Sequence, residues 1–221
     1  MTIRTPFIAT DAIYHTYNKS IAKTIIFDKN ILEKTFEIIN FYRYQQKLRL
    51  SKFNTLTYAA KEVYLKDICA SLPLIDFFAF SLMPNHFHFL IKQLQTGGIK
   101  KFISNFQNSF AKRFNLINNR EGSLFLNGFK CRQIISENEF FHVFRYIHLN
   151  PVSSRLIAFP LLASYPFNSY GWYLNENLNR FINVELAMGH FESKEKFVRF
   201  HKVQVDYQQK LQDIKKALID A

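Results

Sequence analysis

The sequence is poor in the residues that make linkers, disulfides and membrane spans. Six glycines and six prolines among 221 residues leave little room for flexible linkers. The two cysteines, Cys69 and Cys131, are expected to be buried as small apolar side chains, because a reducing compartment disfavours a disulfide. No apolar run is long enough to span a bilayer, and residues 1–6 lack the apolar core of a secretory signal. We therefore expect a cytoplasmic protein without a membrane partner.

Acidic residues are also scarce. The 17 Asp and Glu are outnumbered by 29 Lys and Arg, which gives a formal net charge of +12. Such an imbalance favours a polyanionic partner, nucleic acid first and an anionic membrane surface second. Phenylalanine is abundant instead, and 25 Phe within a hydrophobic fraction of 48% are ample for a packed core. The length suits one domain with an extension, or two small domains.

The stretch 81–93 is the most informative part of the chain. Apolar residues on both sides of Met83-Pro84-Asn85 predict a hairpin of two strands. Because side chains alternate along a strand, His86 and His88 should share one face, with Phe87 and Phe89 on the other. Two imidazoles on one face can form two adjacent corners of a metal site. The alternative is a pair of half-buried strand histidines that have hydrogen-bond partners.

The patterns along the chain predict the fold class. Strands are expected near residues 12–18, 77–82, 86–93 and 131–135. Helices are expected near 30–50, 59–70, 99–118, 137–150, 184–190 and 195–218. This order predicts an α+β fold, a ferredoxin-like antiparallel sheet with helices on one face, plus a C-terminal helical extension. We expect a catalytic domain over residues 8–175 and the extension over 176–221, with one sheet face free for a ligand.

A second group of chemically useful residues lies on the predicted helix 137–150. This helix begins with the capping-box pattern of Ser136 and Glu139, and it is expected to end at Asn150 because Pro151 follows. Tyr146 and Asn150 are four residues apart and so share a face. If that face lies against His86 and His88, two imidazoles and an amide oxygen form a three-ligand site with open positions.

Such a site would suit chemistry on a phosphodiester. A divalent ion can polarise a phosphate oxygen and offset the charge that develops on phosphorus. The phenol of Tyr146 has an ordinary pKa of about 10 and becomes a nucleophile once its surroundings favour the phenolate. Three other interpretations stay open. Tyr146 is a core tyrosine, Asn150 is a helix C-cap, or His142, one turn before Tyr146, competes as a ligand or orients it.

Several motifs, in this order, resemble the REP-associated tyrosine transposases, which belong to the HUH single-tyrosine transposases of the insertion-sequence type. The resemblance spans roughly residues 10–200 and rests on six segments: Tyr14-His15-Thr16-Tyr17-Asn18-Lys19, Leu82-Met83-Pro84-Asn85-His86-Phe87-His88-Phe89-Leu90, Gly122-Ser123-Leu124-Phe125, Arg145-Tyr146-Ile147-His148-Leu149-Asn150-Pro151-Val152, Tyr165-Pro166-Phe167-Asn168-Ser169-Tyr170, and the tail from Val184-Glu185-Leu186 through Phe200. Two departures are a longer stretch between Leu50 and Leu74, and Ser153-Ser154-Arg155 where members often have an arginine directly.

The resemblance implies a role for each motif. His86 and His88 would be the HUH pair, Asn150 the third metal ligand and Tyr146 the nucleophile, with Mg²⁺ or Mn²⁺ as the cofactor. The implied activity is that of a transposase, a strand transferase that cleaves and rejoins single-stranded DNA near hairpins or inverted repeats through a covalent phosphotyrosine. The alternative is a non-catalytic single-stranded or hairpin-binding regulatory protein.

Basic residues are expected to hold the DNA strand beside this site. The candidates lie on the predicted helix 99–118 and around the predicted strand 131–135; they are Lys100, Lys101, Lys112, Arg113, Lys130 and Arg132. A clustered set of charges is also typical of an ordinary solvated face. Either a monomer or a homodimer is expected.

Overall fold

The computed structural model describes residues 8–178 and 180–219. Its centre is a four-stranded sheet of order β2-β3-β1-β4 in which every neighbouring pair is antiparallel. The strands are β1 (Ile13–Lys19), β2 (Ile75–Met83), β3 (His86–Gln93) and β4 (Lys130–Ile134). The predicted α+β class and all four predicted strands are confirmed.

The β2–β3 hairpin fixes the two sides of the sheet. Its turn places Met83 opposite His86 and Ser81 opposite His88, and Tyr17 of β1 pairs with His88 from the other side. Directly paired residues point to the same face, so Ser81, His88 and Tyr17 lie together. Phe87 and Phe89, which alternate with the histidines, point to the opposite face.

The Phe face of the sheet is covered by α1 (Leu32–Tyr42) and α4 (Gly98–Ile117). The predicted Phe stripe of α4 packs there: the ring of Phe106 lies 5.3 Å from that of Phe87 and 5.5 Å from that of Phe89, centre to centre. Phe102 and Phe110 of the same stripe are fully buried. This face therefore holds most of the aromatic core.

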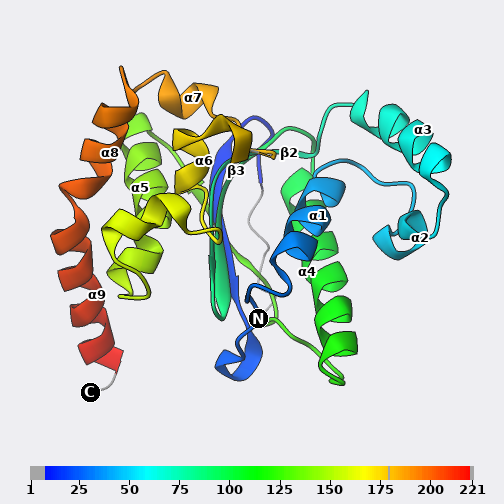
Figure 1. Ribbon diagram of the computed structural model, residues 1–221, viewed down its shortest axis with the longest axis horizontal. Helices are drawn as coiled ribbons and strands as arrows, with labels where there is room; N and C mark the ends of the chain where they lie inside the picture. Colours follow the sequence, from blue (N-terminus) through cyan, green and yellow to red (C-terminus); the bar gives the residue numbers. More distant parts are fainter. Residues whose placement is uncertain (1–7, 179, 220–221) are drawn as a thin grey trace.

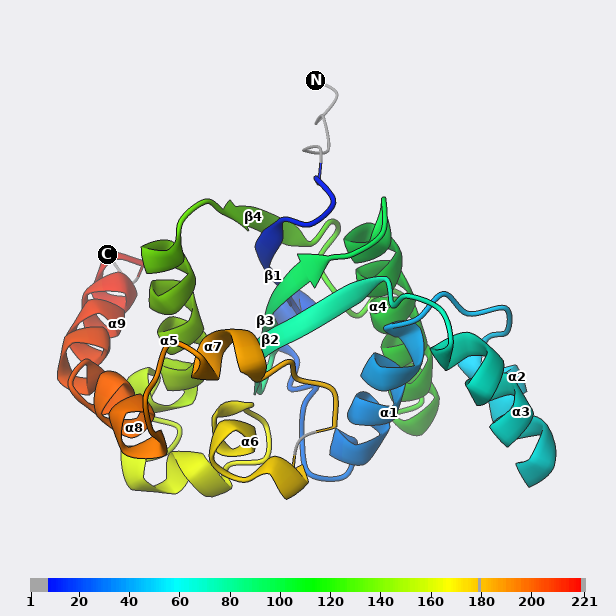
Figure 2. The same cartoon turned by 90° about the horizontal axis from the view of Figure 1, so that it is seen from above.

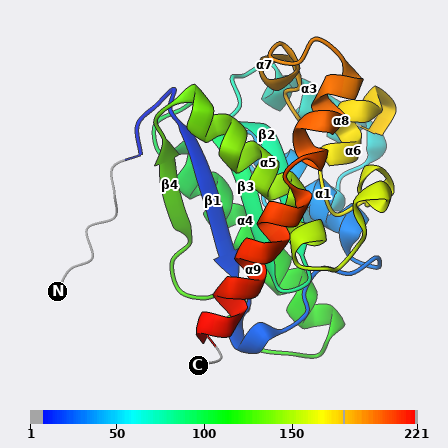
Figure 3. The same cartoon turned by 90° about the vertical axis from the view of Figure 1, so that its left-hand side faces the viewer.

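The His face is covered by α5 (Glu137–Ser153), and α8 (Lys194–Lys202) and α9 (Val205–Ile219) lie outside it (Figures 1 and 3). Helices thus cover both faces of the sheet, where the sequence pattern led us to expect one covered face and one free face. The cause is visible in β2, whose residues 77–83 are all buried. A strand without an exposed side must be packed on both faces.

The insertion between residues 50 and 74 forms two short helices that project from the Phe side, α2 (Leu50–Asn54) and α3 (Tyr58–Cys69) (Figure 2). The helix predicted to run to Leu50 ends at Tyr42. Further along, the amides of Lys47 and Leu48 donate hydrogen bonds to the Tyr64 hydroxyl and not to carbonyls one turn earlier, contacts that local sequence does not reveal. The prediction for Cys69 is wrong: it is exposed, and Cys131 is half-buried.

The C-terminal part of the chain packs onto α5. It contains α6 (Tyr170–Leu174), α7 (Glu185–Met188), α8 and α9, with 3-10 turns at Phe159–Ser164 and Glu176–Leu178; another 3-10 turn, Ile21–Lys23, follows β1. The single helix predicted for 195–218 is two helices that meet near Val203. None of the helices in the part of the chain that the structure describes is long and apolar enough to cross a membrane. Residues 1–6, where the sequence has no apolar signal core, lie outside the described residues.

Candidate active site

The two strand histidines lie on the sheet face that α5 covers. His86 and His88 have ring centres 5.1 Å apart with nearly perpendicular planes. His88 is buried and His86 is partly exposed. Both therefore point the way that the strand alternation predicted, with one ring in the interior and the other near the surface.

Helix α5 brings Tyr146 to the same place. The Tyr146 ring lies edge-on to His88, with ring centres 5.6 Å apart. Asn150, one turn further along α5, is buried and interacts with the Tyr146 side chain. The structure thus brings together all four residues predicted for the metal and nucleophile positions. Their roles remain predictions.

Two residues of β1 complete the cluster, and sequence reasoning did not single them out. His15 stacks on His88 with ring centres 5.1 Å apart and lies 6.1 Å from the Tyr146 ring, and Tyr17 lies 5.4 Å from His88. The signal was present in the alternation of β1, which puts His15 and Tyr17 on one side. What the sequence lacked was the strand order, which makes β1 the neighbour of β3.

Hydrogen bonds at the second ring nitrogens fix the proton of His86 and leave two arrangements for His88. The Nδ1 of His86 lies 2.7 Å from the Oδ1 of Asn85, and an amide oxygen only accepts, so Nδ1 carries the proton. The Nδ1 of His88 lies 2.9 Å from the Nε2 of His15. With His88 as the donor, the Nε2 atoms of His86 and His88 both keep a free lone pair. Neither has a hydrogen-bond partner among residues 8–178 and 180–219.

Burial keeps these imidazoles neutral at physiological pH. Burial, and secondly the charge of Arg132, lowers the pKa of His15 to about 4. Burial, and secondly Lys19, lowers the pKa of His86 to about 4. Burial also lowers the pKa of His88 well below its usual range, and the neighbouring His15, His86 and Lys19 add to this shift. A neutral imidazole is the form that binds a metal ion.

The phenol of Tyr146 is not activated by its protein neighbours. Burial raises its pKa above the ordinary value; the Asn150 side chain acts in the opposite direction, and Tyr17 adds a smaller increase. The Nδ2 of Asn150 is buried and has no hydrogen-bond partner in the described part of the chain. An unpaired N–H donor does not attract a cation, so the fit to a divalent ion rests on the two free Nε2 atoms and on the amide oxygen of Asn150, which could be the third ligand. The charge of such an ion would favour the phenolate.

The donor set also determines what kind of metal site this can be. Among the described residues, no group of three or more His, Cys, Asp or Glu side chains is placed to hold a metal ion. Two imidazoles with one amide oxygen would leave several coordination positions for water or phosphate. This is the pattern of a catalytic site and not of a closed structural one.

Three residues considered from the sequence have other roles in the structure. His142 is exposed, and its Nδ1 contacts the guanidinium of Arg145 at 3.3 Å, so it does not orient Tyr146. Asn150 is not a C-cap, because α5 continues to Ser153. Arg155, at the departure noted after Pro151, forms an ion pair with Asp213 of α9 at 2.7 Å.

The predicted DNA-binding residues divide between the two faces of the sheet. Lys130 and Arg132 are exposed on β4, where they pair with Tyr17 and His15 and so point to the His face. Lys112 and Arg113 belong to α4 on the Phe face (Figure 1). The expectation that they flank the active site is wrong, because the Phe stripe of α4 fixes that helix on the other side. Lys100 and Lys101 are exposed on α4 as well.

The fold and the site define a class of protein: an antiparallel sheet with a His-x-His strand that faces a helix-borne tyrosine. Residues 46–150 match the family model described as "Transposase IS200 like". That segment contains β2, β3, α4, β4 and α5 as far as Asn150, and with them His86, His88, Tyr146 and Asn150. Over this segment, which is just under half of the chain, the protein is similar to the IS200-like transposases, so the family resemblance found in the sequence is confirmed.

Solved structures that resemble this one include two transposases. The first is a REP-associated tyrosine transposase bound to a REP hairpin, with a TM-score of 0.50 and 13% identity; the match covers 81% of this chain and 89% of that one. At that identity it supports the fold. The second, a candidate transposase from Deinococcus radiodurans R1, has a TM-score of 0.36 and 12% identity, with 66% of this chain and 95% of that one covered. The comparison with curated proteins gives no match.

Proposed function

We propose that this protein is a metal-dependent DNA strand transferase that cleaves and rejoins single-stranded DNA through a phosphotyrosine at Tyr146. The observation that carries the proposal is the position of Tyr146 on α5, against His88 and one turn from Asn150. The match of residues 46–150 to a transposase family model supports an enzyme that acts on DNA. Mg²⁺ or Mn²⁺ held by His86, His88 and Asn150 would polarise the phosphate and stabilise the phenolate.

The chain's own residues would do the remaining work. The Oη of Tyr146 would attack the phosphorus after losing its proton to solvent water, and the bond from phosphorus to the 3′ oxygen would break. The 3′ oxygen takes up a proton and leaves as a hydroxyl, and the 5′ phosphate stays on Tyr146. No water enters the ester, so the bond energy is kept for rejoining. His15 would hold His88 in the tautomer that leaves its Nε2 free.

The substrate we propose is single-stranded DNA that carries a hairpin or inverted repeats. One structural relative is bound to a REP hairpin, and this chain has a net charge of +12. Lys130 and Arg132 are exposed on the same face as the candidate nucleophile, where phosphates of an entering strand could reach them. A location in the cytoplasm agrees with this function.

The test is the covalent intermediate. Wild-type protein with a hairpin-bearing single strand and Mg²⁺ or Mn²⁺ is expected to give a protein–DNA adduct that survives denaturation. Tyr146→Phe removes only the hydroxyl, so the fold should persist while the adduct disappears. Tyr207→Phe, an exposed tyrosine on α9, is the matched control and should leave the adduct in place. An adduct on another tyrosine, or none with wild type, would leave only the DNA-binding alternative.

A further inference from the structure

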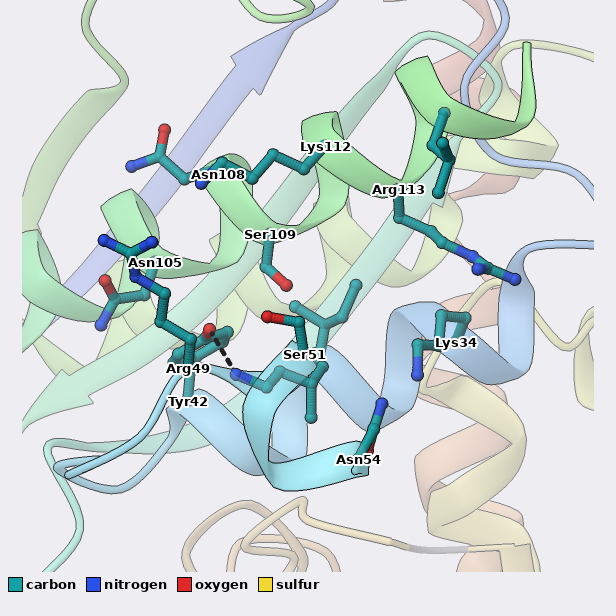
Figure 4. A pocket seen from close by; sticks show the side chains of 13 residues that line it. Lys34, Tyr42, Arg49, Ser51, Asn54, Asn105, Asn108, Ser109, Lys112 and Arg113 are labelled. Carbon is teal, nitrogen blue, oxygen red and sulfur yellow. Dashed lines mark hydrogen bonds between the residues drawn. The ribbon is translucent and has the colours of Figure 1, made fainter. Parts of the chain in front are cut away.

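A basic pocket lies on the Phe side of the molecule, across the sheet from Tyr146. It has a volume of about 660 Å³ and is enclosed by α1, α2 and α4 (Figure 4). The volume lies within the usual range of small-molecule sites. Because α2 belongs to the insertion between residues 50 and 74, one wall of the pocket comes from the stretch in which this chain departs from the family pattern.

The wall formed by α4 is polar because polar residues repeat along one side of this helix. Asn105, Ser109, Lys112 and Arg113 recur at helical spacing and form a stripe next to the buried Phe stripe. The exposed Leu116 continues this wall at the next turn. Side chains on a purely solvated helix face point into open water, whereas these amides and cations line a cavity.

The facing wall adds further cations and amides. Lys34 comes from α1, and Arg49 and Asn54 come from the start and end of α2. Figure 4 shows Arg49 near Asn105 at one end, with Lys34, Asn54 and Arg113 toward the other. Lys34 is paired with Glu37, and no other carboxylate balances the charge, because no Asp or Glu lines the pocket in the described part of the chain.

Arg49, Lys112 and Arg113 form no ion pair with any described residue, so their charges are available to a ligand. The pocket floor is apolar, with Ile38 and Leu50 buried. Cations at the rim, amides on the walls and an apolar floor match the three parts of a nucleotide. The phosphate can pair with the cations, and the base edge can form hydrogen bonds with the amides. The face of the base can pack on the apolar surface.

We propose that this pocket binds a nucleotide of single-stranded DNA, as a second nucleic-acid site on the face opposite Tyr146. The base edge contacts Asn105 and Asn54, and the backbone phosphates contact Arg49, Lys112 and Arg113. A free nucleoside triphosphate fits less well, because no glycine lines the pocket to let backbone amides cradle several phosphates. The inference goes beyond the proposed function and does not depend on chemistry at Tyr146.

The experiment measures binding of a fluorescent single-stranded oligonucleotide by anisotropy, in the Tyr146→Phe background and without divalent metal. Lys112→Ala with Arg113→Ala is expected to weaken binding about tenfold or more. The slope of log affinity against log salt should fall by about 0.7 for each lost contact. The matched control is Lys52→Ala with Lys66→Ala, two exposed lysines of α2 and α3 outside the pocket. This control removes the same charge.

Two further measurements identify the chemical nature of the ligand. Asn105→Leu is expected to narrow the differences in affinity among dA, dC and dT homopolymers, because it removes an amide from the base edge. A dinucleotide should displace the oligonucleotide better than inorganic phosphate does. Equal weakening by the control pair, or equal displacement by phosphate, would overturn the proposal. Because nothing here requires an adduct, failure of the strand-transfer mechanism would leave the result interpretable.

Discussion

At the scale of single residues, the site depends on what each imidazole does with its second nitrogen. His86 donates from Nδ1 to Asn85, its own neighbour in the chain. His88 relies on His15, a residue 73 positions away. The first arrangement is local and could be predicted from the turn sequence. The second appears only when β1 pairs with β3, which is why sequence analysis found the His pair and not its support.

The first prediction follows from this support. His15→Phe should weaken the apparent affinity for Mn²⁺ in DNA nicking by about 10-fold to 100-fold, because His88 loses the partner that fixes its tautomer. His86→Ala with His88→Ala should abolish nicking but leave hairpin binding within a few fold, since affinity comes mainly from phosphate contacts. His142→Phe, at an exposed histidine, is the control. Nicking by the double variant at the wild-type rate would refute the metal assignment.

At the scale of elements, α5 shows where local rules are overridden. Pro151 was expected to end the helix, yet α5 continues to Ser153. A proline cannot donate to the carbonyl one turn earlier, which here belongs to Ile147. The side chain of Asn168 donates to that carbonyl and to the carbonyl of His148, both at 3.2 Å. The helix end was unpredictable because its missing donor comes from another segment.

The same helix contacts the C-terminal extension through a buried chain of hydrogen bonds, called the His201 relay below. His201 of α8 donates from Nδ1 to the Phe197 carbonyl, and its Nε2 lies 3.0 Å from the Nδ1 of His148 on α5. The Nε2 of His148 lies 3.0 Å from the Ser169 hydroxyl. Since a carbonyl only accepts, the proton of His201 lies on Nδ1 and its Nε2 accepts. His148 therefore donates from Nδ1, and its Nε2 accepts from the Ser169 hydroxyl. Both imidazoles are neutral in this arrangement. Burial lowers the pKa of His201 to about 3.

The His201 relay predicts sensitivity to acid. The folded pKa of His201 lies below the unfolded value of about 6.5, so the unfolded state binds more protons between these values. The contribution of His201 is complete above pH 6.5 and is lost as the pH falls. From pH 7.5 to 5.0 the free energy of unfolding should fall by about 2 kcal/mol less in His201→Gln than in wild type, measured by urea denaturation. His142→Gln should follow wild type; an equal fall in all three proteins would contradict the assignment.

At the scale of the whole molecule, the sheet separates two basic surfaces that the sequence could not distinguish. Composition gave the charge, and periodicity gave the strands and most helices, but neither says which face a helix covers. Lys130 and Arg132 lie with the candidate active site, and Lys112 and Arg113 lie with the pocket behind the sheet. The difference arises from strand order and from the Phe side chains that hold α4 in place.

The last prediction separates these surfaces by function. Lys130→Ala with Arg132→Gln should slow formation of the Tyr146 adduct and reduce the salt slope of hairpin binding by about 0.7 for each lost single-strand contact. Arg132 also forms an ion pair with Glu139 of α5, so Glu139→Gln is measured beside it to isolate loss of that pair. The control pair Lys52→Ala with Lys66→Ala removes equal charge elsewhere and should change neither quantity. If the β4 variants keep both the adduct rate and the slope of wild type, β4 is a solvated edge, and the strand must reach Tyr146 by another path.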